Sequence, residues 1–186
     1  MNFQRKALWV SLTAAALLAA CGGGGSDTIL LTPIQGVKVV GDSLADSGTF
    51  GYKITVQGAA LTGTNSTPIW VERVAASYGQ TLCPHFTSSD EVNFSRDAAC
   101  TNYAVSGGRI NNVTAPASPV SITLPVKEAG ANGYAESDVL LVDGGANDAG
   151  DLIRAYLGAA KDGGVAYRTL LSSVLDAGTL QGLLTS

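Results

Sequence analysis

The sequence is poor in the residues that usually bind metals and nucleic acids. It contains one histidine, three cysteines and 14% charged residues, and its formal net charge is −4. The histidine and the scattered cysteines show no spacing typical of a metal site, so we predict no metal and no other cofactor. No cluster of Lys and Arg forms a basic patch, and the acidic balance argues against a nucleic-acid partner.

The length and the apolar content fit one ordinary domain preceded by an export signal. The chain has 186 residues, of which 46% are apolar. Arg5 and Lys6 precede an apolar stretch at residues 7–20, which is too short for a mature transmembrane helix and is typical of a signal peptide. We therefore predict a signal peptide at 1–21, a flexible Gly-rich tether at 22–33 and a folded domain at 34–186.

The end of the apolar stretch resembles the lipobox of bacterial lipoproteins. Leu18-Ala19-Ala20-Cys21 has small residues directly before a cysteine. The resemblance implies that Cys21 becomes the lipidated N-terminus and anchors the protein in a membrane. Because Gly22 follows rather than Asp, the outer membrane is expected, on its periplasmic or surface side. The alternative is an ordinary signal peptide with an incidental cysteine, and then a secreted protein.

The remaining pattern alternates strands with helices, which is typical of an α/β sheet with crossovers. The run 137–143 is the clearest strand, and its continuous apolar residues predict that both faces are covered. Trp70 is expected in the core or in a cleft wall. The expected strands are 37–40, 101–106 and 137–143, and the expected helices are 68–78, 126–134, 151–157, 165–175 (closed by Gly178) and one beginning at 179. Residues 80–100 are expected to form an irregular insertion loop.

Each expected strand ends in a compact polar stretch. The first stretch is Gly41-Asp42-Ser43-Leu44, the second runs from 102 to 107, and the third is Gly145-Ala146-Asn147-Asp148. Adjacent parallel strands would bring these stretches to one edge of the sheet. A serine hydroxyl there is a candidate nucleophile, and glycine N–H and asparagine amide groups can stabilise the oxyanion of acyl transfer. The simpler alternative for Ser43 is a turn that only reverses the chain.

In their order, these blocks resemble those of the GDSL, or SGNH, hydrolases, a family of esterases and lipases. The resemblance covers residues 37–151 and implies a flavodoxin-like three-layer sandwich with a parallel sheet. It implies that Ser43 is the nucleophile and that the N–H groups of Ser43 and Gly107, with the Asn147 side chain, form the oxyanion hole. Asp42 and Asp148 would support the turns by hydrogen bonding. No Gly-x-Ser-x-Gly motif is present, which disfavours the ordinary α/β-hydrolase fold.

The family also has a fourth block, Asp-x-x-His, which supplies the general base and its carboxylate, and this sequence does not contain it. His85 is either an ordinary loop histidine or a substitute base. We expect the chain to be the N-terminal part of a hydrolase domain, poorly active by itself, acting on an acyl ester, a lipid or an acetylated carbohydrate. The competing hypothesis is a catalytically inactive, lipid-anchored binding protein.

Two cysteines remain if Cys21 carries a lipid. Cys83 and Cys100 flank the expected insertion loop, and an exported protein meets an oxidising compartment. A disulfide between them would close and stabilise this loop. The alternative is a pair of buried free thiols, because a sequence does not show the geometry that a bridge requires.

Overall fold

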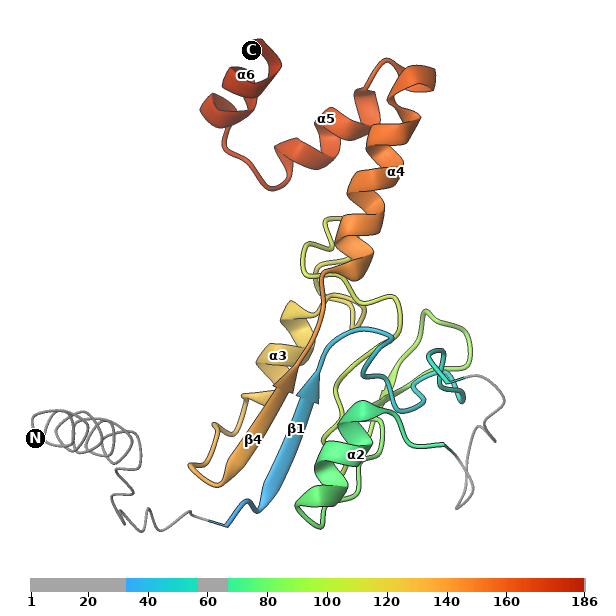
Figure 1. Cartoon of the computed structure of the whole chain (residues 1–186), viewed down its shortest axis with the longest axis vertical. Coiled ribbons are helices and arrows are strands. Elements are labelled where there is room, and N and C mark those ends of the chain that lie inside the picture. Colours follow the sequence, from blue (N-terminus) through green and yellow to red (C-terminus); the bar gives the residue numbers. More distant parts are fainter. Residues whose placement is uncertain (1–32, 57–66, 186) are drawn as a thin grey trace, which may run out of the picture. The chain divides into compact units, whose positions relative to one another are not determined.

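The computed structural model describes residues 33–56 and 67–185. The predicted signal peptide, the lipidation site at Cys21 and almost all of the predicted tether lie outside the described residues. The described residues belong to one compact unit that begins at Pro33. Its helices and strands are drawn in Figure 1.

A small parallel sheet forms the centre of the unit. Strand β1, Gly36–Val40, pairs in parallel with β4, Asp138–Val142, in a register that sets Val40 opposite Val142. The two strands lie side by side in Figure 1. Their side chains are mostly Val and Leu, which fit a pleated sheet that packs on a core. The coarse prediction of a mixed α/β fold with a parallel sheet and helices is therefore confirmed.

The predicted strand at 101–106 is an extended segment in which Asn102 forms two isolated parallel bridges, one with Val39 and one with Pro84. Val39 N–H donates to Thr101 O at 3.0 Å, and Tyr103 N–H donates to Val39 O at 2.7 Å. This segment thus lies on the edge of β1 away from β4. The prediction of a regular strand was wrong, because the segment is irregular on either side of Asn102. The Asn102 side chain accepts the Ala104 N–H, so this group, which faces away from β1, binds no neighbouring strand.

Helix α2, Trp70–Ser77, packs its apolar side on the sheet. Val71 and Ala75 are fully buried, and Gly79, at φ +72°, follows the helix end as predicted. Trp70 is 41% exposed, so the core position, one of its two predicted places, was wrong. Neighbouring positions on a helix point about 100° apart, and Trp70 therefore turns away from the face that Val71 buries. The core residues are Val37, Val39, Ala45, Ile69, Val71, Ala75, Leu82 and Ala104.

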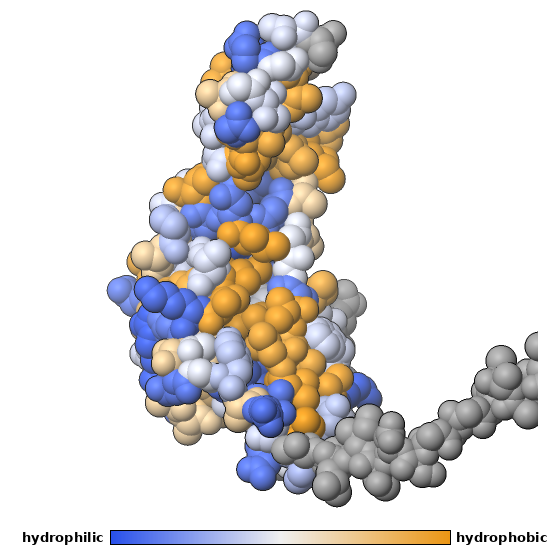
Figure 2. Space-filling model, turned by 90° about the vertical axis from the view of Figure 1, so that its left-hand side faces the viewer, coloured by the Kyte–Doolittle hydropathy of each residue, from blue (hydrophilic) through white to orange (hydrophobic). Residues whose placement is uncertain are grey.

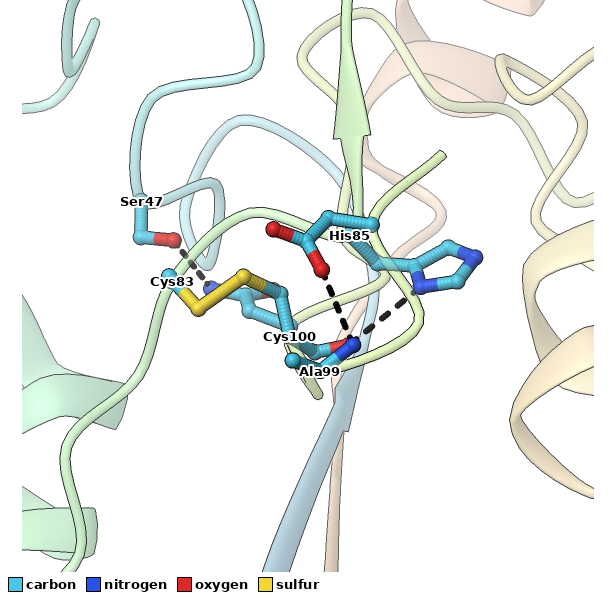
Figure 3. The surroundings of a disulfide bond; sticks show 7 residues. Ser47, Cys83, His85, Ala99 and Cys100 are labelled. Carbon is cyan, nitrogen blue, oxygen red and sulfur yellow. Dashed lines mark hydrogen bonds between the residues drawn. A yellow bond between two sulfur atoms is a disulfide. The ribbon is translucent and has the colours of Figure 1, made fainter. Parts of the chain in front are cut away.

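The predicted irregular loop at 80–100 contains a small hairpin. Strand β2, Phe86–Thr87, pairs antiparallel with β3, Ser95–Arg96. The structure joins Cys83 to Cys100 in a disulfide, one of the two alternatives that the sequence left open. Figure 3 shows His85 and Ser47 beside this bridge.

Helix α3, Thr123–Ala129, begins and ends earlier than the predicted 126–134. Pro125 lies in its first turn, where a missing N–H is not needed, and Gly130 caps its end. The prediction that β4 is covered on both faces was wrong as well. Leu140 and Val142 are 41% and 58% exposed, while Val139 and Leu141 pack against the core.

The C-terminal part consists of α4, Ala146–Asp162, α5, Val165–Ser172, and α6, Ala177–Thr185. Helix α4 extends beyond the predicted 151–157 at both ends: Gly145, at φ +99°, lets it begin directly after the turn, and it ends before Gly163, at φ +67°. Gly178 lies inside α6 and does not end a helix as predicted. None of these helices has a fully buried residue, and Figure 2 shows apolar side chains on the surface. Among the described residues, no helix is long and apolar enough to span a membrane.

Candidate functional site

The first turn of the candidate site follows β1 directly. The Asp42 carboxylate accepts the Leu44 N–H at 3.0 Å, and the Asp42 carbonyl accepts the Ala45 N–H at 3.2 Å. These bonds make a tight turn with Ser43 at its centre. Ser43 is half-buried, and no described residue hydrogen-bonds its hydroxyl. The hydroxyl is therefore available to a bound molecule.

The second turn follows the extended segment at 102–106 and lies against the first. Val105 N–H donates to Gly41 O at 3.1 Å. A Cβ at Gly108 would lie 3.1 Å from the same Gly41 oxygen, so the two backbones approach each other at a place that only glycine fits. Gly107 adopts φ +82°, which also favours glycine. Close packing therefore requires glycine at 108, and the backbone conformation favours glycine at 107.

The third turn connects β4 to α4 and is tied to the second. The Asn147 side-chain amide donates to Gly108 O at 2.9 Å, which uses one of its two hydrogens. The Asp148 carboxylate accepts the N–H groups of Ile110 and Asn111 at 2.9 and 2.8 Å. The structure thus brings together the turns that carry Ser43, Gly107 and Asn147.

Two backbone N–H groups in these turns have no acceptor among the described residues. They belong to Ser43 and Gly107, whereas the N–H groups on either side of each are all bound. Asp42 N–H donates to Asp143, and Ser106 N–H donates to Asp46. The other flanking N–H groups are those of Leu44 and Gly108. An oxyanion hole consists of such unpaired donors in a fixed frame.

Arg109 is a site residue that the sequence reasoning missed. Its guanidinium donates to Gly107 O at 2.8 Å and forms an ion pair with Asp151 on α4. Hydrogen bonding from Arg109 lowers the pKa of Asp151. The spacing of Asp148 and Asp151, one helical turn apart, is the sequence feature that could have indicated a shared partner on the second turn.

Asp143, at the end of β4, was missed as well. Its Oδ1 accepts the Asp42 N–H at 2.9 Å. The Oδ2 atoms of Asp42 and Asp143 are buried, and neither has a hydrogen-bond partner among the described residues. Burial raises the pKa of Asp143 most strongly, and the Asp42 charge raises it further. The hydrogen bond from the Asp42 N–H lowers this pKa and so opposes both effects.

His85 is not joined to Ser43 by any contact within the described part of the chain. Its Nδ1 lies 3.2 Å from Cys100 O, and its Nε2 lies 3.4 Å from a Glu128 oxygen. The ring is buried and stacks on Tyr103 at 4.2 Å between centroids. These contacts occupy both ring nitrogens, so His85 is a buried, packed histidine of the loop.

No protein-family model, no curated protein and no solved structure matches this chain. The function must therefore be inferred from the residues themselves. Within the described residues, no group of three or more His, Cys, Asp or Glu could hold a metal ion. The three turns therefore present the Ser43 hydroxyl, two N–H groups without an acceptor in the described part of the chain, one remaining hydrogen of the Asn147 amide, and buried carboxyl groups.

Proposed function

We propose that this chain provides the nucleophile and the oxyanion hole of a serine esterase of the GDSL type. The observation that carries the proposal is that the N–H groups of Ser43 and Gly107 have no acceptor among the described residues, in turns whose flanking N–H groups are all bound. Ser43 is the nucleophile that attacks the ester carbonyl. The negative oxygen of the tetrahedral intermediate is held by these two N–H groups and by the second amide hydrogen of Asn147.

The substrate is a carboxylic ester: an acyl ester, a lipid or an acetylated carbohydrate. Attack by Ser43 forms an acyl-enzyme and releases the alcohol, and water then releases the acid. A serine hydroxyl needs a base for fast attack, and the ring nitrogens of His85 are held by Cys100 O and Glu128. We therefore expect the 186-residue chain to react slowly, at the residual level that an oxyanion hole alone supports, roughly 10³–10⁴ over water.

A second candidate is favoured by the same contacts of His85. A lipid-anchored protein that binds an ester or a glycan without cleaving it needs the site but no base. Membrane attachment through Cys21 and a place in the outer membrane belong to both candidates. The two differ in whether Ser43 forms a covalent bond.

Covalent labelling with a fluorophosphonate distinguishes the candidates. The purified chain is incubated with the probe, and the modified peptide is identified by mass spectrometry. We expect labelling on Ser43, its loss in Ser43→Ala, and unchanged labelling in Ser89→Ala, which removes an exposed serine from another loop. An unlabelled chain, or a label on other serines only, would refute the esterase and leave the binding protein.

A further inference from the structure

The position of Ser43 depends on where its turn leaves β1, and the neighbouring strand controls this point. Asp143 N–H donates to Val40 O at 3.1 Å, which extends the pairing of β1 and β4 by one residue. The Asp143 side chain then reaches across to β1, and its Oδ1 accepts the Asp42 N–H at 2.9 Å. Asp143 thus holds the chain on both sides of Gly41.

The same carboxyl fills the space beside Gly41. A Cβ at Gly41 would collide with Oδ1 and Cγ of Asp143, so the carboxyl rests on the Gly41 α-carbon. Gly41 is followed by Asp42, which is 1% exposed, and then by Ser43. The contact leaves the first turn no room to shift toward β4.

Placing the Asp143 carboxyl beside Asp42 has an energetic cost, because neither group is fully hydrogen-bonded among the described residues. Two carboxyl groups meet here, and each has a buried oxygen without a hydrogen-bond partner among the described residues. Unpaired buried carboxylate oxygens are unfavourable, and two neighbouring carboxylates repel each other. Burial and the Asp42 charge accordingly raise the pKa of Asp143, so that its neutral form is favoured. Buried titratable groups with shifted pKa values occur at functional sites more often than elsewhere.

We propose that Asp143 is a positioning residue for Ser43: its carboxyl oxygen fixes the Asp42 N–H and thereby aims the turn that carries the nucleophile. This inference rests on the proposed function of Ser43. Asp143 acts through Asp42 and Gly41 and does not touch the ester. Its role needs an acceptor oxygen at Oδ1 and does not need a charge. A displacement of a reacting group by about 1 Å can slow a reaction roughly 100-fold, so a hydrogen bond of this kind matters for rate.

The test separates the acceptor from the charge. Asp143→Ala removes the acceptor, whereas Asp143→Asn keeps an oxygen in place and removes the charge. Asp138→Ala is the matched control, because Asp138 lies on the same strand and pairs with Lys38 and the Ala135 N–H, away from the turn. For each variant, fluorophosphonate labelling of Ser43 is measured over a range of probe concentrations. This gives the maximal labelling rate and the probe concentration at half-maximum separately.

We expect Asp143→Ala to lower the maximal rate at least tenfold with little change in the half-maximal concentration. Asp143→Asn should restore most of the rate, and Asp138→Ala should leave it unchanged. A folded Asp143→Ala that labels at the original rate would overturn the proposal, and so would an Asp143→Asn as slow as the alanine variant. If the unmodified chain does not label at all, the proposed function itself fails, which is a different result.

A measurement on the unmodified chain covers the case in which Asp143→Ala does not fold. Amide hydrogen exchange at Asp42 should be slow, because its N–H is bound to Asp143. The N–H of Ser43, which has no acceptor among the described residues, should exchange faster. Equal and fast exchange at both positions would overturn the proposal.

Discussion

Asp46 Oδ2 accepts hydrogen bonds from both the N–H and the hydroxyl of Ser106, at 2.8 and 2.6 Å. The other oxygen of this fully buried carboxylate accepts the N–H groups of Gly48 and Thr49. One side chain therefore connects the loop that follows Ser43 to the segment that leads into Gly107. This carboxylate holds the first two turns of the candidate site together, in addition to the backbone bond from Val105 N–H to Gly41 O.

The first prediction concerns Asp46→Asn. An asparagine offers one acceptor oxygen, and its NH₂ group would face N–H donors that now bind a carboxylate. Leaving buried donors unpaired costs about 1–3 kcal/mol each, so we expect the free energy of unfolding to fall by about 2–4 kcal/mol. Urea unfolding measures this change. Asp90→Asn is the control, because Asp90 makes similar bonds to Val92 and Asn93 on an exposed loop and should change stability little.

The second prediction concerns the pH dependence of stability at Asp143. Its pKa is raised in the folded state, so the folded chain binds this proton more tightly than the unfolded chain. That stabilisation is complete below the ordinary carboxyl pKa, near 4, and is lost as the pH rises through the raised value. The amide that replaces the carboxyl in Asp143→Asn has no such proton to lose. We expect this variant to be more stable than the original chain near pH 7 and the difference to shrink in acid.

Asp138 is a control for this measurement, because its pKa is shifted in the opposite direction to that of Asp143. Its pKa is lowered, first by the Ala135 N–H and then by Lys38, so its contribution is present at neutral pH and lost as the pH falls. Asp138→Asn should therefore be less stable than the original chain near pH 7. Unfolding curves recorded from about pH 3 to about pH 8 span the carboxyl range and compare the variants. A curve for Asp143→Asn that runs parallel to that of the original chain would contradict the expected sign.

Local chemistry explains which parts of this fold can be predicted from the sequence. Strands β1 and β4 have short apolar runs with a glycine one or two residues after their ends. Helix α2 has apolar residues one turn apart and is followed by Gly79, so neighbouring residues suffice to predict that these elements exist and of which type they are. The three polar turns follow from the position of small residues at strand ends. The bounds of α3 and α4 were less predictable, because Pro125 and Gly145 permit more than one start.

The parts that could not be predicted depend on partners far apart in the chain. Asp46, Asp143 and Arg109 are ordinary polar residues in the sequence, and their importance arises from Ser106, Asp42 and Asp151 across the fold. The exposure of Leu140 and Val142 could not be predicted either, since an apolar run predicts a strand but does not show which residues cover it. The choice between a disulfide and two thiols also required the relative position of Cys83 and Cys100.

The third prediction concerns the Cys83–Cys100 disulfide. The bridge closes a loop with a sequence separation of 17, and such a loop contributes about 3 kcal/mol by restricting the unfolded chain. We expect a reductant to lower the free energy of unfolding by about 3 kcal/mol, which appears as a lower midpoint of urea unfolding. A variant with serine at both positions should be as unstable as the reduced chain and should not respond to the reductant. An unchanged midpoint on reduction would show that the bridge contributes little.

The last prediction concerns Arg109, which binds Gly107 O and Asp151 at the same time. Lysine has a single charged nitrogen and cannot reproduce this forked contact. We expect Arg109→Lys to loosen the attachment of α4 to the second turn. The amides of Ile110 and Asn111, which bind Asp148 on the same helix, should then exchange about tenfold faster, equivalent to about 1.4 kcal/mol.

Arg154 is the matched control, because it pairs with the same Asp151 carboxylate but is exposed and does not reach the turn. An exposed ion pair contributes little to stability, so Arg154→Lys should leave the exchange of both amides unchanged. If both variants have the same effect, the guanidinium hydrogen bonds to Asp151 matter and the contact with Gly107 does not. If Arg109→Lys alone speeds the exchange, the guanidinium is the link that keeps the Gly107 and Asn147 turns together.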